Sequence, residues 1–330
     1  MKVKIYQTQL YKIPLSNGIE RSGLLIGILD ENGNKGFGEC APLPKWSRET
    51  LEDCLQQFRQ KMTDIVSIEW STSHWQSKLL ELNLHPALSF GLESALLSLI
   101  SPLPKKLSLT TSALLMGSPE EILKEADQRS KEGFTFAKLK VGHLDFKTAE
   151  NLIIRLKDVF RLRIDVNRAW DTLDSLRFFS KFSLDSFDYV EEPFKNPLDL
   201  DKFEHSLAVD ESFPKDLSLA QLEKLPALKT LIYKPTIQGG LLQCLPLNEW
   251  ANKRAVSIVL SSCFESDLAL SHVASLAHRL SITTASGIGT YHYLKDTLLL
   301  HPLKFSGALV HIPDKIQPKP GLKDLEINNT

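Results

Sequence analysis

A regular alternation of short apolar runs with polar, helix-periodic stretches constrains the fold of this chain more than any other feature. Eight such runs, rich in leucine or β-branched residues, lie between residues 109 and 286. They cover residues 109–116, 136–141, 162–167, 189–192, 207–210, 231–234, 257–262 and 282–286. Strands that alternate with helices pair in parallel, and eight of them are the number that closes a β/α barrel. The pattern therefore predicts a parallel barrel.

An open, doubly wound sheet is the alternative to a barrel. It is disfavoured because no GxGxxG follows the first strand, and GxxxxGK[ST] is absent from the sequence.

The first hundred residues follow a different pattern. Residues 3–13, 24–30 and 35–40 alternate like strands, with a turn at 30–34, and residues 47–65 and 86–100 are helix-periodic. Strands followed by helices predict a small α+β domain. Pro102 and Pro104 then mark a linker. We expect an N-terminal domain at 1–104, a barrel at 105–304, and a tail at 305–330 that returns to the first domain.

Charge and hydropathy exclude several classes of protein. Lys and Arg total 39 against 40 Asp and Glu, so the chain lacks the basic excess that binding to nucleic acid by counterion release requires. Charged or polar residues interrupt every apolar stretch before it reaches membrane-spanning length. The N-terminus alternates like a strand and has no apolar signal-peptide core. We expect a cytoplasmic protein that acts on a small molecule, with no nucleic acid, membrane or obligate protein partner.

The four cysteines point to no metal site. They are far apart and form no CxxC pair, so they are expected to be small buried hydrophobic residues.

Charged residues recur at the ends of five consecutive predicted strands. A lysine pair two residues apart, which shares one face of its strand, is followed by three single carboxylates and a further lysine. These residues are Lys138 with Lys140, then Asp165, Glu191, Asp210 and Lys234. Their spacing matches one β/α unit per step, which places them at the carboxyl rim where barrel enzymes carry their active sites.

Each of these residues alone has an ordinary interpretation as a helix cap or a solvated side chain. Taken together, these residues are not explained by such ordinary interpretations, because burying so many charges around one opening is costly unless they balance each other or bind an ion. Three carboxylates on successive strands form an all-oxygen site that suits Mg²⁺ or Mn²⁺. Lysines on both flanks are candidate bases, since desolvation and nearby positive charge lower a lysine pKa.

The order KxK, DxN, EEP, DES and KP resembles the muconate-lactonizing-enzyme branch of the enolase superfamily. The stretches GECAPLP, WSRET, SSCFES and SGIGT are more specifically similar to the o-succinylbenzoate synthases (MenC-type enzymes) of menaquinone biosynthesis. The resemblance implies a modified TIM barrel of (β/α)7β type. It also implies an α+β capping domain built from the N-terminal segment and the C-terminal tail.

The resemblance also implies an activity, that of a hydro-lyase acting on a carbon–oxygen bond. In such an enzyme Asp165, Glu191 and Asp210 hold one Mg²⁺, with Mn²⁺ as a substitute. Lys140 removes the proton alpha to a substrate carboxylate and then protonates the departing hydroxyl. Lys234 stabilises the enediolate across the barrel, where the metal also absorbs charge.

Supporting residues follow from the same resemblance. Lys138 would depress the pKa of Lys140, and Asn167 would support the metal site from beside or behind. Loops 16–23 and 41–46 are the candidate lid. The residues expected to contact substrate carboxylates are Arg21, Ser261, Ser262 and Gly287. Glu192 and Glu211 each follow a ligand by one residue and are assigned no metal contact.

Two other functions remain open at this point. An N-acylamino acid racemase or a dipeptide epimerase would use the same two lysines on the same fold, because function is decided in the pocket and not by the fold. The GECAPLP and SSCFES stretches favour the synthase, and no Asp-x-Asp pair is evident near residues 286–290. A non-catalytic barrel is disfavoured because all five charged strand ends are present.

Overall fold

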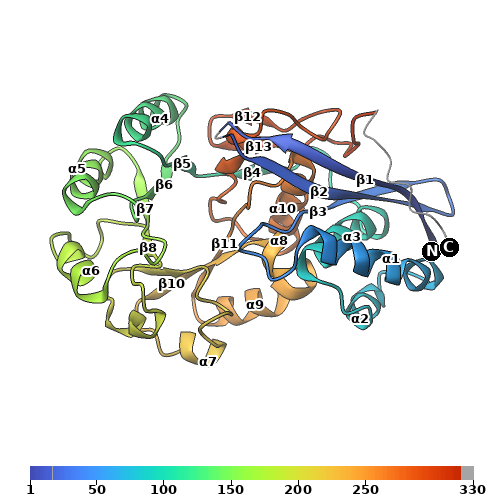
Figure 1. Ribbon diagram of the computed structural model, residues 1–330, viewed down its shortest axis with the longest axis horizontal. Helices are drawn as coiled ribbons and strands as arrows, with labels where there is room; N and C mark the ends of the chain where they lie inside the picture. Colours follow the sequence, from blue (N-terminus) through green and yellow to red (C-terminus); the bar gives the residue numbers. More distant parts are fainter. Residues whose placement is uncertain (17, 321–330) are drawn as a thin grey trace.

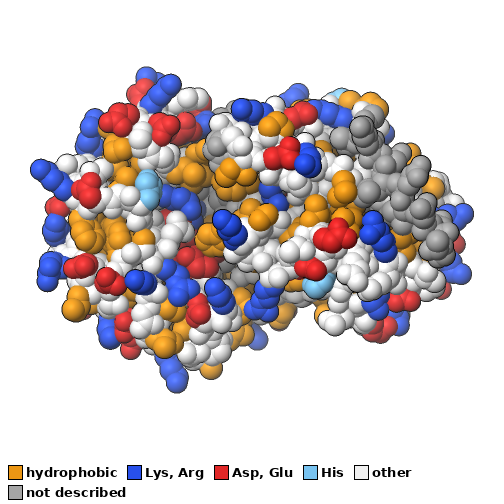
Figure 2. Space-filling model, viewed as in Figure 1, with side chains coloured by type: hydrophobic (Ala, Val, Ile, Leu, Met, Phe, Trp, Pro, Cys, Tyr) orange, Lys and Arg blue, Asp and Glu red, His pale blue; other side chains and the backbone are white. Residues whose placement is uncertain are grey.

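The computed structural model describes residues 1–16 and 18–320. It has two lobes (Figure 1): an antiparallel sheet covered by helices, and a curled parallel sheet ringed by helices. The parallel sheet confirms the α/β class predicted from the alternating runs. Charges of both signs are scattered over the face shown in Figure 2.

The first lobe contains the predicted strands. β1 (Val3–Pro14), β2 (Glu20–Asp30) and β3 (Lys35–Cys40) pair as an antiparallel sheet. Helices α1 (Leu51–Ser67), α2 (Trp75–Glu81) and α3 (Pro86–Ile100) pack against it. α3 lies so close to β3 that a Cβ added to Gly38 would stand only 1.8 Å from the carbonyl oxygen of Gly91. Glycine at both positions lets the two backbones approach.

The start of α1 differs from the prediction. The helix was expected to begin near Ser47, but it begins at Leu51, with Thr50 and Asp53 forming a capping box. Ser47 instead accepts a hydrogen bond at 2.9 Å from the backbone of Leu43, within the preceding turn. The short helix α2 was not predicted, because its first turn has no side-chain cap and the residues before it are polar.

The second lobe is a seven-stranded parallel sheet with its strands in consecutive order. The strands are β5 (Ala113–Leu115), β6 (Phe136–Lys140), β7 (Arg161–Asp165), β8 (Tyr189–Glu191), β9 (Leu207–Val209), β10 (Leu228–Tyr233) and β11 (Ser257–Leu260). The connecting helices include α4 (Pro119–Lys131), α5 (Phe146–Leu156), α6 (Thr172–Phe179), α7 (Leu219–Leu222), α8 (Pro235–Gln238), α9 (Leu241–Lys253) and α10 (Asp267–Arg279). The short 3-10 helix η1 (Pro197–Lys202) follows β8.

Two of the eight predicted strands were wrong in detail. The run at 109–116 divides into β4 (Ser108–Thr110) and β5, and β4 pairs instead with β13 (Leu309–His311), which also pairs with β12 (Lys304–Ser306). The run at 282–286 forms no regular strand. Single parallel bridges join Ser286 to Thr111 and Gly287 to Ser261, so this segment contacts both edge strands of the sheet. The 3-10 helix η2 (Gly289–Tyr293) follows at once and ends the extended backbone.

The four cysteines are free and buried, as predicted. Within residues 1–16 and 18–320, no helix combines the length and apolar character that crossing a membrane requires. Of the tail, residues 321–330 lie outside the described residues. Leu298, Leu299 and Ile316 pack with Tyr11 and neighbouring residues of the first sheet.

Two buried carboxylates of the first lobe reach the starts of helices in the second. Glu39 on β3 accepts hydrogen bonds at 3.1 Å from the backbone of Ser266 and of Ala269, at the start of α10. Glu93 on α3 accepts from the backbone of Leu241 and of Leu242, at the start of α9. Helix N-termini favour negative charge, so these contacts join the two lobes.

Glu93 makes the stability of this junction depend on pH. Burial raises its pKa from 4.5 to about 7, and the two helix N–H groups and Arg279 only partly oppose this. The native state therefore binds more protons than the unfolded state between these values, and its stability falls as the pH rises through them. We expect the unfolding free energy of Glu93→Gln, relative to the native protein, to rise by up to ~3 kcal/mol between pH 5 and pH 8.

Urea unfolding at several pH values measures this difference. Glu120→Gln, at an exposed carboxylate in the first turn of α4, is the matched control and is expected to follow the native protein. The prediction would be contradicted if the unfolding free energies of Glu93→Gln and of the native protein changed with pH in parallel.

Candidate active site

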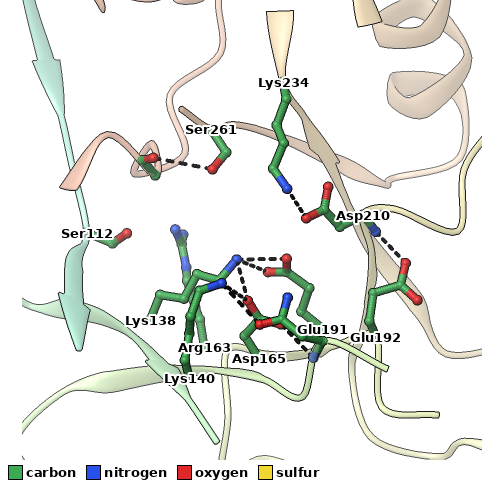
Figure 3. A network of polar contacts seen from close by, with 12 residues as sticks. Ser112, Lys138, Lys140, Arg163, Asp165, Glu191, Glu192, Asp210, Lys234 and Ser261 are labelled. Atoms are coloured by element: carbon green, nitrogen blue, oxygen red, sulfur yellow. Dashed lines mark hydrogen bonds and ion pairs between the residues drawn. The ribbon is translucent and has the colours of Figure 1, made fainter. Parts of the chain in front are cut away.

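The strand register brings the predicted charged residues to one level of the sheet. Lys140 on β6 is the register partner of Asp165 on β7, and Asp165 is the partner of Glu191 on β8. Asp210 directly follows β9, and Lys234 directly follows β10. Figure 3 shows their side chains pointing toward one another at the carboxyl ends of five successive strands.

These side chains form one network of ion pairs. Lys138 Nζ lies 3.0 Å from Asp165 Oδ2 and 2.7 Å from Glu191 Oε2. Lys140 Nζ lies 3.4 Å from Asp165 Oδ2. Lys234 Nζ donates to Asp210 Oδ2 on the other side. Three carboxylates thus face three ammonium groups, which is how the site carries so much charge in a buried position.

Exposure separates the two lysines of β6. The Lys138 side chain is 13% exposed and is held by two carboxylates, whereas the Lys140 side chain is 31% exposed. Lys140 also donates to Asn167 Oδ1 at 3.1 Å. Lys140 is therefore the one with room to meet a molecule entering from the rim.

Burial and charge act against each other on these groups. Burial and the neighbouring Asp165 carboxylate raise the pKa of Glu191 well above its usual value. Burial also acts to raise the pKa of Asp165, but Lys138 and Lys140 outweigh it and the pKa is lowered. For Lys138 and Lys234 burial acts to lower the pKa, yet the facing carboxylates outweigh it and raise the pKa of both. A raised pKa favours the ammonium form of both lysines.

Glu192 organises the backbone beside the carboxylates. It adopts a left-handed conformation with φ of 45°, and its side chain turns away from Glu191. It accepts hydrogen bonds from the backbone of Asp210 at 2.8 Å and of Ser212 at 2.9 Å. The second glutamate of the EEP sequence thus fixes the turn that carries Asp210, a role that the sequence alone did not show.

The residues expected to contact substrate lie in two places. Ser262 donates to the carbonyl oxygen of Gly287 at 2.9 Å, and Ser261 does so at 3.3 Å, so both hydroxyls join the end of β11 to the neighbouring segment. Figure 3 shows Ser261 across the opening from Lys138 and Lys140, on the same side as Lys234. Their contact with substrate stays a prediction.

Arg21 lies in the body of the first lobe instead. It is buried and donates to the carbonyl oxygens of Ala41 and of Pro42, the latter at 2.7 Å. Its guanidinium holds the start of the 41–46 loop, and its contact with a substrate carboxylate stays a prediction.

A cavity of about 850 Å³ adjoins the network. It is lined by Asn167, Asp210 and Lys234 from the barrel side and by residues 45–48 of the loop, with Phe213 and Ile237 among its apolar wall. A charged end beside an apolar wall suits a small carboxylate that has a hydrocarbon body.

The donor set fits a hard divalent cation. Asp165 and Glu191 are fully buried carboxylates, and their oxygens lie 3.0 and 2.7 Å from the Lys138 ammonium group, so the site already holds positive charge beside them. Within the part of the chain that the structure describes, no three His, Cys, Asp or Glu side chains converge closely enough to hold a metal as they stand. In this arrangement Lys138 bridges two of the carboxylates and Lys234 pairs with the third.

Comparison with known proteins gives the family. Residues 121–322 match the enolase C-terminal domain-like family, and residues 2–99 match the MenC N-terminal domain. An o-succinylbenzoate synthase from Vibrio cholerae serotype O1 (strain M66-2) is 32% identical over 303 residues, which cover 85% of this chain and 87% of the relative. The chain belongs to the o-succinylbenzoate synthase family of the enolase superfamily. The corresponding enzyme from Pasteurella multocida (strain Pm70) is 29% identical over 91% of this chain and 92% of its own length.

Solved structures show the same fold at low identity. A dipeptide epimerase from Enterococcus faecalis V583 superposes with a TM-score of 0.82 at 19% identity, covering 94% of this chain and 96% of the epimerase. A mandelate racemase/muconate lactonizing protein from Herpetosiphon aurantiacus has a TM-score of 0.83 at 17% identity, covering 98% of each chain. The same epimerase complexed with Mg and the dipeptide L-Leu-L-Tyr has a TM-score of 0.78 at 17% identity, covering 96% of this chain and 98% of its own. As a member of the o-succinylbenzoate synthase family, the protein is an enzyme of the lyase class.

Proposed function

We propose that the protein catalyses the Mg²⁺-dependent dehydration of 2-succinyl-6-hydroxy-2,4-cyclohexadiene-1-carboxylate to 2-succinylbenzoate in menaquinone biosynthesis. The observation that carries the proposal is the gathering of three lysines and three carboxylates at one rim, in a chain that matches o-succinylbenzoate synthases over most of its length.

The proposal includes the finer architecture. The seven strands together with residues 286–287 would form a (β/α)7β barrel, supported by the two bridges that join this segment to both sheet edges. The domain limits would be 1–104, 105–304 and 305–330. The N-terminal lobe and the tail would then form one capping domain over the rim.

Asp165, Glu191 and Asp210 would hold the Mg²⁺, with Mn²⁺ as a possible substitute. The burial of all three carboxylates at one rim, beside ammonium groups, supports this assignment. Once bound, the cation would draw negative charge from a substrate carboxylate and so make the alpha proton more acidic. Lys138, held between two of these carboxylates, balances their charge from the barrel interior.

Lys140 would serve as the base. Its partly exposed amine would take the alpha proton, and the electron pair left behind would spread into the carboxylate. Lys234, on the opposite side of the opening, would stabilise that charge with its ammonium group. The hydroxyl on the adjacent ring carbon would then leave with the proton returned by Lys140. One water is released, and the ring becomes aromatic.

A spectrophotometric assay tests the proposal directly. The purified protein, stripped of metal with a chelator, is mixed with the cyclohexadiene carboxylate with and without added Mg²⁺. We expect aromatisation with Mg²⁺ and a rate at least about a hundredfold lower without it. No turnover with Mg²⁺ would reject the proposal. Exchange of the alpha proton of N-acylamino acids or dipeptides in deuterated water would then support a racemase or epimerase on this fold.

A further inference from the structure

The loop at residues 41–48 places one aromatic side chain on the carboxylate–lysine network. The Nζ atom of Lys234 lies 5.4 Å from the ring centroid of Trp46, within the range of a cation–π contact. Both residues line the cavity beside Asp210. This loop directly follows β3, a strand of the antiparallel sheet. The first lobe therefore contacts the network through the indole ring of Trp46.

The loop is fixed by its own hydrogen bonds. The backbone of Trp46 and that of Ser47 donate to the carbonyl oxygen of Leu43, at 3.1 and 2.8 Å. Lys45 takes a left-handed conformation with φ of 72°, which closes the turn. Arg21 holds the loop's beginning by its bonds to two carbonyl oxygens. These bonds hold the backbone of the turn that carries Trp46, while the ring itself is 47% exposed and faces the cavity beside Lys234.

The two contacts described for the Lys234 ammonium are the Asp210 carboxylate and the Trp46 ring. Under the proposed function Asp210 would help to hold the metal, and the Trp46 ring would remain as a contact of the Lys234 ammonium group. We infer that Trp46 is a positioning residue that keeps the Lys234 ammonium at the opening where negative charge develops. The catalytic part of this inference rests on the proposed function. The contact between the Trp46 ring and the Lys234 ammonium group does not depend on it.

Three variants separate this role from others. Trp46→Leu keeps an apolar side chain but removes the ring, whereas Trp46→Phe retains an aromatic face. Trp250→Leu is the matched control, because the ring of Trp250, on α9, lies 4.9 Å from the guanidinium of Arg254 in a similar contact. We expect Trp46→Leu to lower kcat about three- to thirtyfold with KM within about twofold. Trp46→Phe should keep most of the activity, and Trp250→Leu all of it.

A double-mutant cycle in the metal-free protein tests the contact without activity. Trp46→Leu, Lys234→Met and the double variant are unfolded in urea, and their single effects are expected not to add. Additive effects would overturn the inference. The inference would also be overturned if Trp46→Leu left kcat unchanged or only raised KM. It would likewise be overturned if Trp46→Phe lowered kcat as much as Trp46→Leu does. Absence of dehydration by the native protein would instead reject the proposed function, and the unfolding cycle would still decide whether the contact exists.

Discussion

Replacing Lys140 with alanine is expected to lower kcat for dehydration by at least about a thousandfold. A positioned general acid–base group contributes about a hundred- to ten-thousandfold, and this one would serve both proton transfers. The expected loss corresponds to ~4 kcal/mol of activation free energy. Folding should be unaffected, because Lys140 is partly exposed and Asp165 keeps its partner Lys138.

The measurement is the Mg²⁺-dependent assay on Lys140→Ala, with the thermal midpoint recorded on the same sample. Lys147→Ala, an exposed lysine on α5, controls for the loss of a positive charge nearby and should retain full activity. Turnover that survives in Lys140→Ala and disappears in Lys138→Ala would assign the base to the other lysine of β6.

Replacing Glu191 with glutamine is expected to abolish the effects of Mg²⁺ on both activity and stability. An amide has the shape of the carboxylate but lacks its charge, and a hard cation depends on that charge. A ligand that binds only the native state at a hundred times its Kd stabilises it by ~2.7 kcal/mol. The native protein should therefore melt a few degrees higher in saturating Mg²⁺, and Glu191→Gln should not.

Activity in saturating Mg²⁺ should fall at least about a thousandfold in the same variant, because the cation supplies several kcal/mol of charge stabilisation. Glu204→Gln, an exposed carboxylate before β9, serves as the control and should keep the shift in melting temperature. An unchanged Mg²⁺ response in Glu191→Gln would remove this carboxylate from the metal site.

Local periodicity made much of this structure predictable. Alternation located β1 to β3 and the strands from β6 to β11 to within a few residues, because buried strands need apolar runs. The position of charge at strand ends located Lys140, Asp165 and Glu191, since parallel strands end at a common edge. No such rule fixed the eighth run, where the extended backbone shrinks to bridges at Ser286 and Gly287.

Contacts between distant segments could not be obtained in this way. The hydrogen bonds from Arg21 to two backbone carbonyl oxygens of the 41–46 loop are such a contact, because nothing in the local pattern pairs these segments. The role of Glu192 depends on a left-handed backbone conformation that glutamate rarely adopts. The raised pKa of Lys138 depends on how closely Asp165 and Glu191 approach its ammonium group, and only three-dimensional structure shows those distances.

The carboxylates of Glu39 and Glu93 have a consequence for how this protein diverges and how it can be recombined. Each is buried in one lobe and satisfied by the first backbone amides of a helix in the other. If a lobe from a relative does not place the first amides of α10 and α9 beside Glu39 and Glu93, these buried carboxylates lose their hydrogen-bond donors. Chimeras of two family members are therefore expected to be more stable when the β3–α10 and α3–α9 pairs come from the same parent.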